Sequence, residues 1–184
     1  ILITGVGMPS TIYHLTKKVL QEKYDLVVQA GIAGSFSKKI KKGQVVLVTQ
    51  DAFGDVGIEE KAEFKTLFNM GFADENKFPF ENGVLINKYD VSKVTQLKLV
   101  NGVTINKISD RRKQMKSLKK KFNAEIETME GAALHFVCLQ LGINFLQLRS
   151  ISNYVGIRDK SKWKIKTAIE NLNIELTRII NTIL

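Results

Sequence analysis

Three short segments of the sequence combine glycines or polar side chains in patterns that could hold a small polar ligand. They are the glycine-rich run 30–35, the acidic run 127–133 and the polar run 149–154. We expect them to lie at the carboxyl ends of buried strands, where open α/β sheets bind their ligands. Together they would offer carboxylates, an amide and closely approaching backbone to one small molecule.

The acidic run begins with a pair of carboxylates in the sequence Glu-Thr-Met-Glu-Gly-Ala-Ala, which starts at Glu127. One acid ahead of an apolar helix could simply cap that helix. Glu130, however, is followed at once by glycine and alanine, which predicts small and crowded surroundings, and a buried carboxylate needs partners. The hydroxyls of a sugar diol could supply them, because an ionised carboxylate accepts hydrogen bonds.

The amide of Asn153 and the glycines of run 30–35 each allow two interpretations. Asn153 follows an apolar strand, so it either ends that strand or donates from its amide to the edge of a purine base. Gly31 and Gly34 could let the backbone approach a ligand, but such a run is more often only a turn, and it does not match the spacing G-x-G-x-x-G. The histidines, His14 and His135, lie on predicted helices and form no site. The sequence shows no metal-ligand spacing and no Ser/His/Asp arrangement.

Alternating strand and helix patterns predict the scaffold that carries these segments. The predicted strands are 1–4, 25–29, 45–48, 83–86, 102–105 and 144–151. The predicted helices are 9–23, 111–121, 129–141 and 161–184, with one more at 58–70 inside a long loop, 51–82. The strand–helix–strand order favours a largely parallel sheet covered by helices, in a single α/β domain over residues 1–184.

The net charge of +10 leaves a nucleic-acid-binding protein as one possibility. The lysines are spread along the chain, however, and the densest basic run, 111–121, lacks interleaved aromatic residues, so a solvated surface is the favoured explanation. The single cysteine, Cys138, permits no disulfide within the chain, which favours a reducing cytoplasm. No apolar stretch reaches the ~20 residues that a membrane span needs.

In their order along the chain, the three runs resemble the nucleoside phosphorylase/nucleosidase superfamily, and the resemblance covers nearly the whole chain. Its most specific part is the pairing of Met-Glu-Gly-Ala-Ala at 129–133 with Arg-Ser-Ile-Ser at 149–152. Within the superfamily, the chain most resembles the futalosine hydrolases, through Glu-Thr-Met-Glu-Gly at 127–131, Ile-Ser-Asn-Tyr-Val at 151–155 and Arg-Asp-Lys-Ser-Lys-Trp at 158–163.

Nucleosidases that act on methylthioadenosine and S-adenosylhomocysteine resemble the chain less closely. They usually carry Glu-Met-Glu where this chain has Thr-Met-Glu at 128–130. They also carry Ile-Ser-Asp where this chain has Ile-Ser-Asn at 151–153.

The resemblance implies a role for each residue of the predicted site. Glu130 would bind the ribose hydroxyls, and Thr128 and Met129 would contact the substrate, with Met129 packed on the sugar. Asn153 would contact N7 and O6 of the purine, and Arg149 would support the site from its strand. The ribose and the attacking water would face the run Gly31, Ile32, Ala33 and Gly34.

The resemblance also implies a fold and an activity. The fold would be a three-layer αβα sandwich around a mixed, largely parallel sheet, in a homo-oligomer with no metal or organic cofactor. The activity would be release of hypoxanthine from futalosine in menaquinone biosynthesis. The alternatives are a methylthioadenosine/S-adenosylhomocysteine nucleosidase or a purine nucleoside phosphorylase. A basic nucleic-acid-binding protein without catalysis is a third possibility.

Two features of the superfamily's pattern have no counterpart in the sequence. Members carry a further strand and a water-activating acid upstream of the region where this chain begins, so we expect the fold to start before Ile1. A protein that starts at Ile1 is accordingly expected to be weakly active or inactive. The aromatic residue that stacks on the base should lie near 106–110, which contains none.

Overall fold

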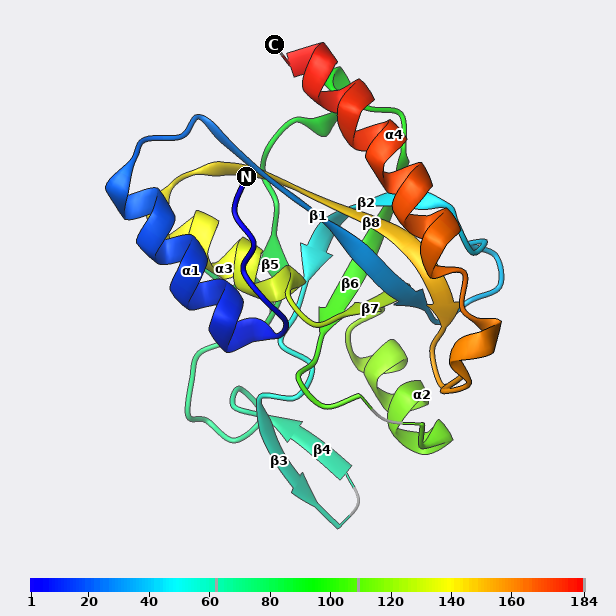
Figure 1. The fold of residues 1–184 in the computed structure, drawn as a ribbon. Helices are drawn as coiled ribbons and strands as arrows, with labels where there is room; N and C mark the ends of the chain where they lie inside the picture. The colour runs from blue at the N-terminus through cyan, green and yellow to red at the C-terminus, as the bar shows by residue number, and fades with distance from the viewer. Residues whose placement is uncertain (62, 109, 184) are drawn as a thin grey trace.

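The computed structural model of the protein describes residues 1–61, 63–108 and 110–183 (Figure 1). Strands and helices alternate along most of the chain, as the sequence predicts. In chain order the elements are α1 (Met8–Gln21), β1 (Leu26–Ser35), β2 (Val45–Asp51), β3 (Gly57–Glu60), β4 (Glu63–Thr66), β5 (Leu85–Ile86), the 3-10 turn η1 (Val91–Lys93), β6 (Lys98–Thr104), α2 (Arg112–Lys121), β7 (Ile126–Thr128), α3 (Gly131–Leu141), β8 (Asn144–Tyr154), the 3-10 turn η2 (Lys160–Lys162) and α4 (Ile165–Ile183).

The main sheet is mixed and nearly closes on itself. Its strand order is β5-β2-β6-β7-β1-β8, and an additional pairing of β8 with β2 closes β2, β6, β7, β1 and β8 into a ring, with β5 attached to β2 outside it. The pairs β1–β8, β2–β6 and β6–β7 are parallel, whereas β1–β7, β2–β5 and β2–β8 are antiparallel. Every strand of this ring contributes to one apolar cluster, which fills its interior with Ala33, Ile40, Val46, Val48, Val100, Ile126 and Ile151.

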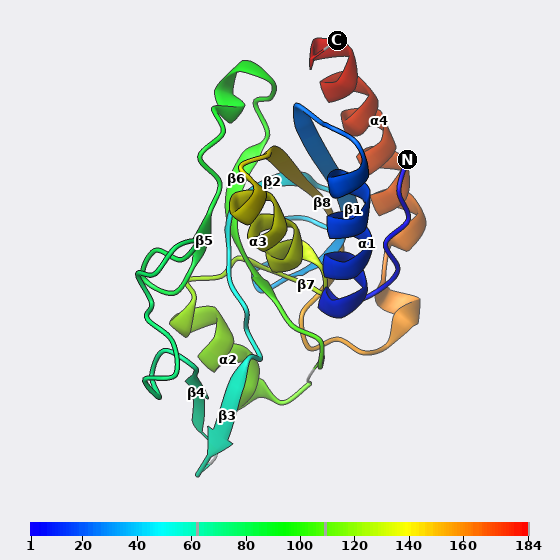
Figure 2. The ribbon, with the colours of Figure 1, turned by 90° about the vertical axis from the view of Figure 1, so that its left-hand side faces the viewer.

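Helices cover the sheet on two sides and complete the predicted three-layer arrangement. Figures 1 and 2 show α1 and α3 on one side and α4 on the other. On one side of the sheet, α1 and α3 pack on β8 through Leu15, Leu134, Val137, Cys138 and Phe145. On the other side, α4 packs on β2 and β8 through Leu47, Leu146, Leu148, Leu172 and Ile179. Because α3 is apolar on nearly all faces, it fits between α1 and the sheet.

Three predicted elements are wrong. The helix expected at 58–70 is a hairpin of β3 and β4, whose turn includes Lys61 at a φ of 51°. The strand expected at 1–4 has no regular secondary structure and pairs with no strand among the described residues, and Ile1 and Ile3 are exposed. The glycine turn expected at 30–35 is instead the second half of β1, which runs on to Ser35.

Helix α2 lies below the sheet and packs Leu118 and Phe122 against Val103 and Ile105 of the β6 region. Its other side chains are largely basic and solvent-exposed, as the sequence predicts. No helix in the described part of the chain is both long and apolar enough to cross a membrane.

Candidate active site

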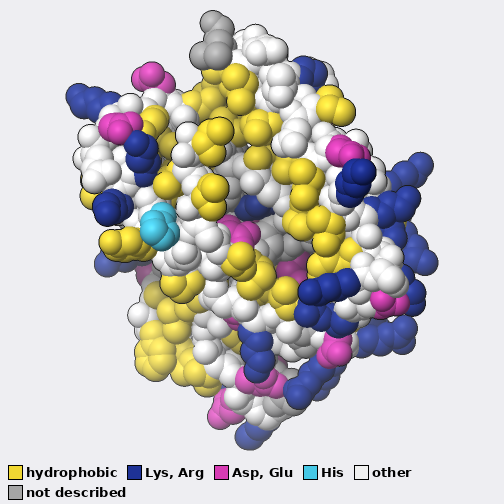
Figure 3. Space-filling model, in the orientation of Figure 1, with side chains coloured by type: hydrophobic (Ala, Val, Ile, Leu, Met, Phe, Trp, Pro, Cys, Tyr) yellow, Lys and Arg dark blue, Asp and Glu magenta, His cyan; other side chains and the backbone are white. Residues whose placement is uncertain are grey.

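A cavity of about 260 Å³ lies where the carboxyl-terminal parts of β1 and β8 meet β7. The molecule is hollowed near the centre of the face drawn in Figure 3, and acidic side chains are visible inside the hollow. All three segments that the sequence singles out reach the cavity. Its lining includes seven of the predicted site residues: Ile32, Ala33, Gly34, Thr128, Met129, Glu130 and Asn153.

Asn153 owes its direction to an irregularity in β8. The pairing of β1 with β8 shifts between Ala33 and Gly34, so that Gly34 lies opposite Asn153 and Ser152 is the extra residue. Such bulges bend a strand and re-aim a side chain. The Ser152 hydroxyl lies 2.8 Å from Oδ1 of Asn153, and Nδ2 of Asn153 donates to the Tyr154 carbonyl at 3.2 Å. These two hydrogen bonds use Oδ1 and one N–H of the Asn153 amide, so the second N–H is available to a ligand.

Glu130 stands at the junction of α3 and the start of α1. Its Oε1 accepts a hydrogen bond from the backbone N–H of Gly7, the N-cap residue of α1, at 3.0 Å. A carboxylate is favoured at this position by the partial positive charge of a helix N-terminus. Glu130 is half-buried and lines the cavity, so its carboxylate can also face a ligand.

Arg149 and Gly31 support the cavity from behind and do not line it. The Arg149 side chain is 2% exposed and donates from Nη2 to Oε1 of Gln29. Burial lowers the pKa of Arg149, while the negative charges of Glu130 and Asp51 raise it. A Cβ atom at Gly31 would lie 1.9 Å from Nη1 of Arg149, so a side chain at this position would displace the guanidinium.

Thr128 directs its hydroxyl into the protein interior. Its Oγ1 lies 2.9 Å from Oγ1 of Thr104 and accepts from the N–H of Gly131 at 3.1 Å. Thr104 in turn donates to Oδ1 of Asp51 at 2.9 Å. Asp51 is fully buried, which raises its pKa to about 6, and Gln147 donates to its second oxygen at 3.1 Å. This network anchors the start of α3, and hence Glu130, to the sheet.

Some cavity residues have no assigned role in the sequence interpretation. Glu127 is 9% exposed, and burial raises the pKa of its carboxyl to about 7. Trp163 and Ile108 provide apolar surface, and Nε1 of Trp163 donates to the Ile157 carbonyl at 2.8 Å. Trp163 closes the run 158–163, which is one of the segments that resemble the futalosine hydrolases. That run is the signal that could have identified it as a cavity residue.

The described residues contain no group of three or more His, Cys, Asp or Glu side chains that could hold a metal ion. His14 and His135 lie on α1 and α3, as predicted. His135 is completely buried, and burial lowers its pKa to about 4. Its Nδ1 lies 3.0 Å from the Leu85 carbonyl, so it has a structural partner.

Fold, sequence motifs and cavity agree with the class of protein that the sequence resembles. A family model of the phosphorylase superfamily matches residues 1–184. The chain belongs to the phosphorylase superfamily.

Individual proteins of two kinds, futalosine hydrolases and methylthioadenosine/S-adenosylhomocysteine nucleosidases, are similar to the chain over most of its length. A futalosine hydrolase of Thermus thermophilus is 27% identical over 182 residues, which cover 97% of this chain and 80% of that protein. A 5'-methylthioadenosine/S-adenosylhomocysteine nucleosidase of Buchnera aphidicola is 26% identical over 202 residues, which cover 100% of this chain and 74% of that protein. Among solved structures, a futalosine hydrolase mutant of Helicobacter pylori shares the fold with a TM-score of 0.80 at 18% identity, over 97% of this chain and 78% of that one.

Proposed function

We propose that the protein hydrolyses the N-glycosidic bond of futalosine and releases hypoxanthine. Membership in the phosphorylase superfamily and relatives that are nucleosidases make it an enzyme of the nucleoside-cleaving class. The observation that carries the choice of base is the orientation of Asn153. Its Oδ1 faces the Ser152 hydroxyl, which leaves an amide N–H for the acceptors N7 and O6 of hypoxanthine.

Two cavity residues would lower the barrier to bond cleavage by electrostatics. As the bond breaks, positive charge develops on the ribose and negative charge on the departing base. The Glu130 carboxylate would accept from the ribose hydroxyls and favour the positive charge. The Asn153 amide would donate to the base and favour its departure. Because about 1.4 kcal/mol is worth a factor of ten in rate, several such contacts must act together.

The remaining predicted residues would shape the site around these two. Met129, Ile32 and Ala33 would provide surface for the sugar, and Gly34 would leave space beside Asn153, since a Cβ atom there would lie 3.4 Å from Nδ2. Arg149 would support Glu130 from behind through the favourable interaction of their charges. The hydroxyl of Thr128 would hold the start of α3 rather than the substrate, because it is bonded to Thr104 and Gly131.

We also propose that the enzyme is a cytoplasmic homo-oligomer that serves menaquinone biosynthesis. The support for self-association is an apolar groove of about 860 Å³ along α1. It contains the exposed side chains of Tyr13 and Leu20 and the aromatic rings of Phe53, Phe80 and Phe136. Light scattering coupled to size-exclusion chromatography tests this expectation, and a monomer at micromolar concentration would contradict it.

The second candidate activity is cleavage of methylthioadenosine or S-adenosylhomocysteine, which the relative from Buchnera aphidicola favours.

A non-catalytic nucleic-acid-binding role is disfavoured by the surface. Figure 3 shows most Lys and Arg side chains of the drawn face along its edge. The groove beside α2 is lined by Lys61, Arg111, Lys113 and Lys121, but also by the acidic side chains of Asp55, Glu59 and Glu63. The test is kcat/KM of the full-length protein on futalosine, inosine, methylthioadenosine and S-adenosylhomocysteine. The futalosine assignment predicts the highest value for futalosine, and a higher value for either adenine nucleoside would contradict it.

A further inference from the structure

Glu127 lies in the same row of the sheet as Asn153, with only a glycine between them. Gly34 of β1 pairs with Glu127 of β7 on one side and with Asn153 of β8 on the other. Paired residues of neighbouring strands carry their side chains on the same face of a sheet. Glu127 and Asn153 therefore project to one side, across the gap that Gly34 leaves, and all three residues line the cavity.

The width of this gap suits a flat ring. Neighbouring strands lie about 4.7–4.9 Å apart, so two spacings separate the Cα atoms of Glu127 and Asn153 by about 9–10 Å. A hydrogen bond at each side takes up about 3 Å, which leaves room for the edge of a purine. A Cβ atom at Gly34 would lie 3.1 Å from Cγ2 of Val155 and 3.4 Å from Nδ2 of Asn153, so a larger residue would fill this space.

The two kinds of purine base differ at the atoms that would face Glu127. A 6-oxopurine presents N7 and O6 as acceptors and N1–H as a donor. A 6-aminopurine presents N7 as an acceptor, its amino group as a donor and N1 as an acceptor. Since an ionised carboxylate can only accept hydrogen bonds, it complements N1–H and repels the lone pair of an unprotonated N1.

We propose that Glu127 is a specificity-determining residue, which accepts a hydrogen bond from N1–H of a 6-oxopurine while Asn153 donates to the N7/O6 edge. The inference rests on the proposed function for the class of substrate and adds a second point of recognition on the base. Two contacts, one at N1–H and one at the N7/O6 edge, would select hypoxanthine over adenine more strongly than Asn153 alone.

The charges around Glu127 make this selection depend on pH. Burial raises the pKa of the Glu127 carboxyl to about 7, the positive charge of Arg158 lowers it, and the negative charge of Asp55 raises it. Above this pH the carboxylate accepts from N1–H of a 6-oxopurine. Below it the protonated carboxyl donates to N1 of a 6-aminopurine. Preference for the 6-oxopurine should therefore rise with pH.

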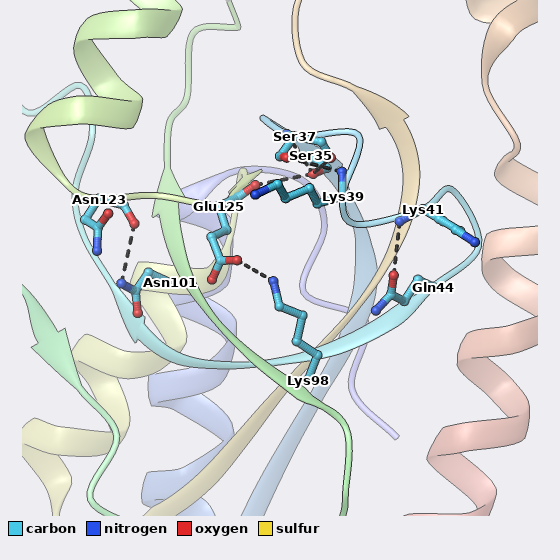
Figure 4. Close-up of polar contacts among 9 residues, drawn as sticks. All are labelled: Ser35, Ser37, Lys39, Lys41, Gln44, Lys98, Asn101, Asn123 and Glu125. Carbon is cyan, nitrogen blue, oxygen red and sulfur yellow. Dashed lines mark hydrogen bonds and ion pairs between the residues drawn. The ribbon is translucent and has the colours of Figure 1, made fainter.

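Free-base binding separates this inference from the proposed catalysis. We would measure the dissociation constants of hypoxanthine and adenine by calorimetry at about pH 6 and about pH 8, with the full-length protein, Glu127→Gln and Glu125→Gln. Glu125 is the matched control because it is two residues away and is paired with Lys98 at the strand edge (Figure 4). It does not line the cavity.

The parent protein should prefer hypoxanthine more strongly at the higher pH, by about tenfold for a group that titrates near neutrality. Glu127→Gln should lower the preference at the higher pH about tenfold, because a neutral amide forms a weaker bond with N1–H, and should abolish its rise with pH. Glu125→Gln should behave as the parent. A Glu127→Gln protein that keeps both the preference and its rise with pH would overturn the inference. Absence of nucleoside cleavage by a parent that shows the expected binding would instead overturn only the proposed function.

Discussion

The substitution Asn153→Asp should move base preference from 6-oxopurines toward 6-aminopurines. In the parent, the Asn153 amide can donate to the acceptors N7 and O6 of hypoxanthine. An aspartate offers oxygens in both positions, so an ionised side chain would repel that edge. A protonated aspartate can donate to N7 of adenine while its other oxygen accepts from the amino group.

The magnitude follows from the contacts of Asn153 that the change alters. Its Nδ2 donates to the Tyr154 carbonyl at 3.2 Å, and the aspartate would place an oxygen against that carbonyl. This loss is common to both substrates and cancels from their ratio. The contact with the base edge differs between the two substrates, so its loss does not cancel. An unpaired buried polar group costs about 1–3 kcal/mol, so the ratio of kcat/KM values should shift by roughly 10- to 100-fold.

The assay compares a 6-oxopurine nucleoside with a 6-aminopurine nucleoside that carries the same sugar and 5' substituent. Base release is measured for the full-length parent, Asn153→Asp and Asn101→Asp. Asn101 lies on β6 and does not line the cavity, so Asn101→Asp controls for the added charge. Equal losses of kcat/KM on both nucleosides would mean that Asn153 only ends its strand, and the reasoning would fail.

Three further outcomes are expected. Glu130→Ala should fold, since it loses one hydrogen bond from Gly7, worth about 1.5–3 kcal/mol to a charged acceptor, and a favourable charge interaction with Arg149, but it should lose nearly all turnover; a parental kcat/KM would remove Glu130 from the ribose site. Gly31→Ala should lower the melting temperature by several degrees, because its Cβ atom would overlap Nη1 of Arg149 at 1.9 Å and overpacking costs about 1–3 kcal/mol; an unchanged melting temperature would contradict the packing. The raised pKa of Glu127 means that its contribution to the free energy of unfolding is present below about pH 4.5 and is lost as pH rises through about 7. Free energies of unfolding from urea titrations at several pH values should therefore depend on pH differently in the parent and in Glu127→Gln over this range. Parallel plots of unfolding free energy against pH would refute the burial effect.

Much of the scaffold is predictable because its strongest sequence patterns are long. The apolar segments that become β8 and α3 and the amphipathic segment that becomes α4 agree with the structure to within a few residues. Convergence of the three polar segments on one cavity is also confirmed, since all reach the lining. The long elements and the convergence of the three segments both follow from general rules of burial and of sheet topology, which can be applied to a single sequence.

The remaining differences arise where tertiary contacts override local patterns. β7 has only three residues, too few for a periodic signal, yet its pairing places Glu127 in the cavity. Gly31 belongs to a strand because it pairs with Arg149 of β8, and the Arg149 guanidinium occupies the space that a side chain of residue 31 would need. The shift of register at Ser152, which decides where Asn153 points, has no marker in the sequence.

The reaction products test most directly whether the protein cleaves futalosine by hydrolysis. The full-length protein is incubated with futalosine in phosphate-free buffer and in phosphate buffer, and both products are identified by mass spectrometry. We predict hypoxanthine and the free sugar product, formed at the same rate with and without phosphate. A sugar 1-phosphate, or release of hypoxanthine only when phosphate is present, would contradict the account.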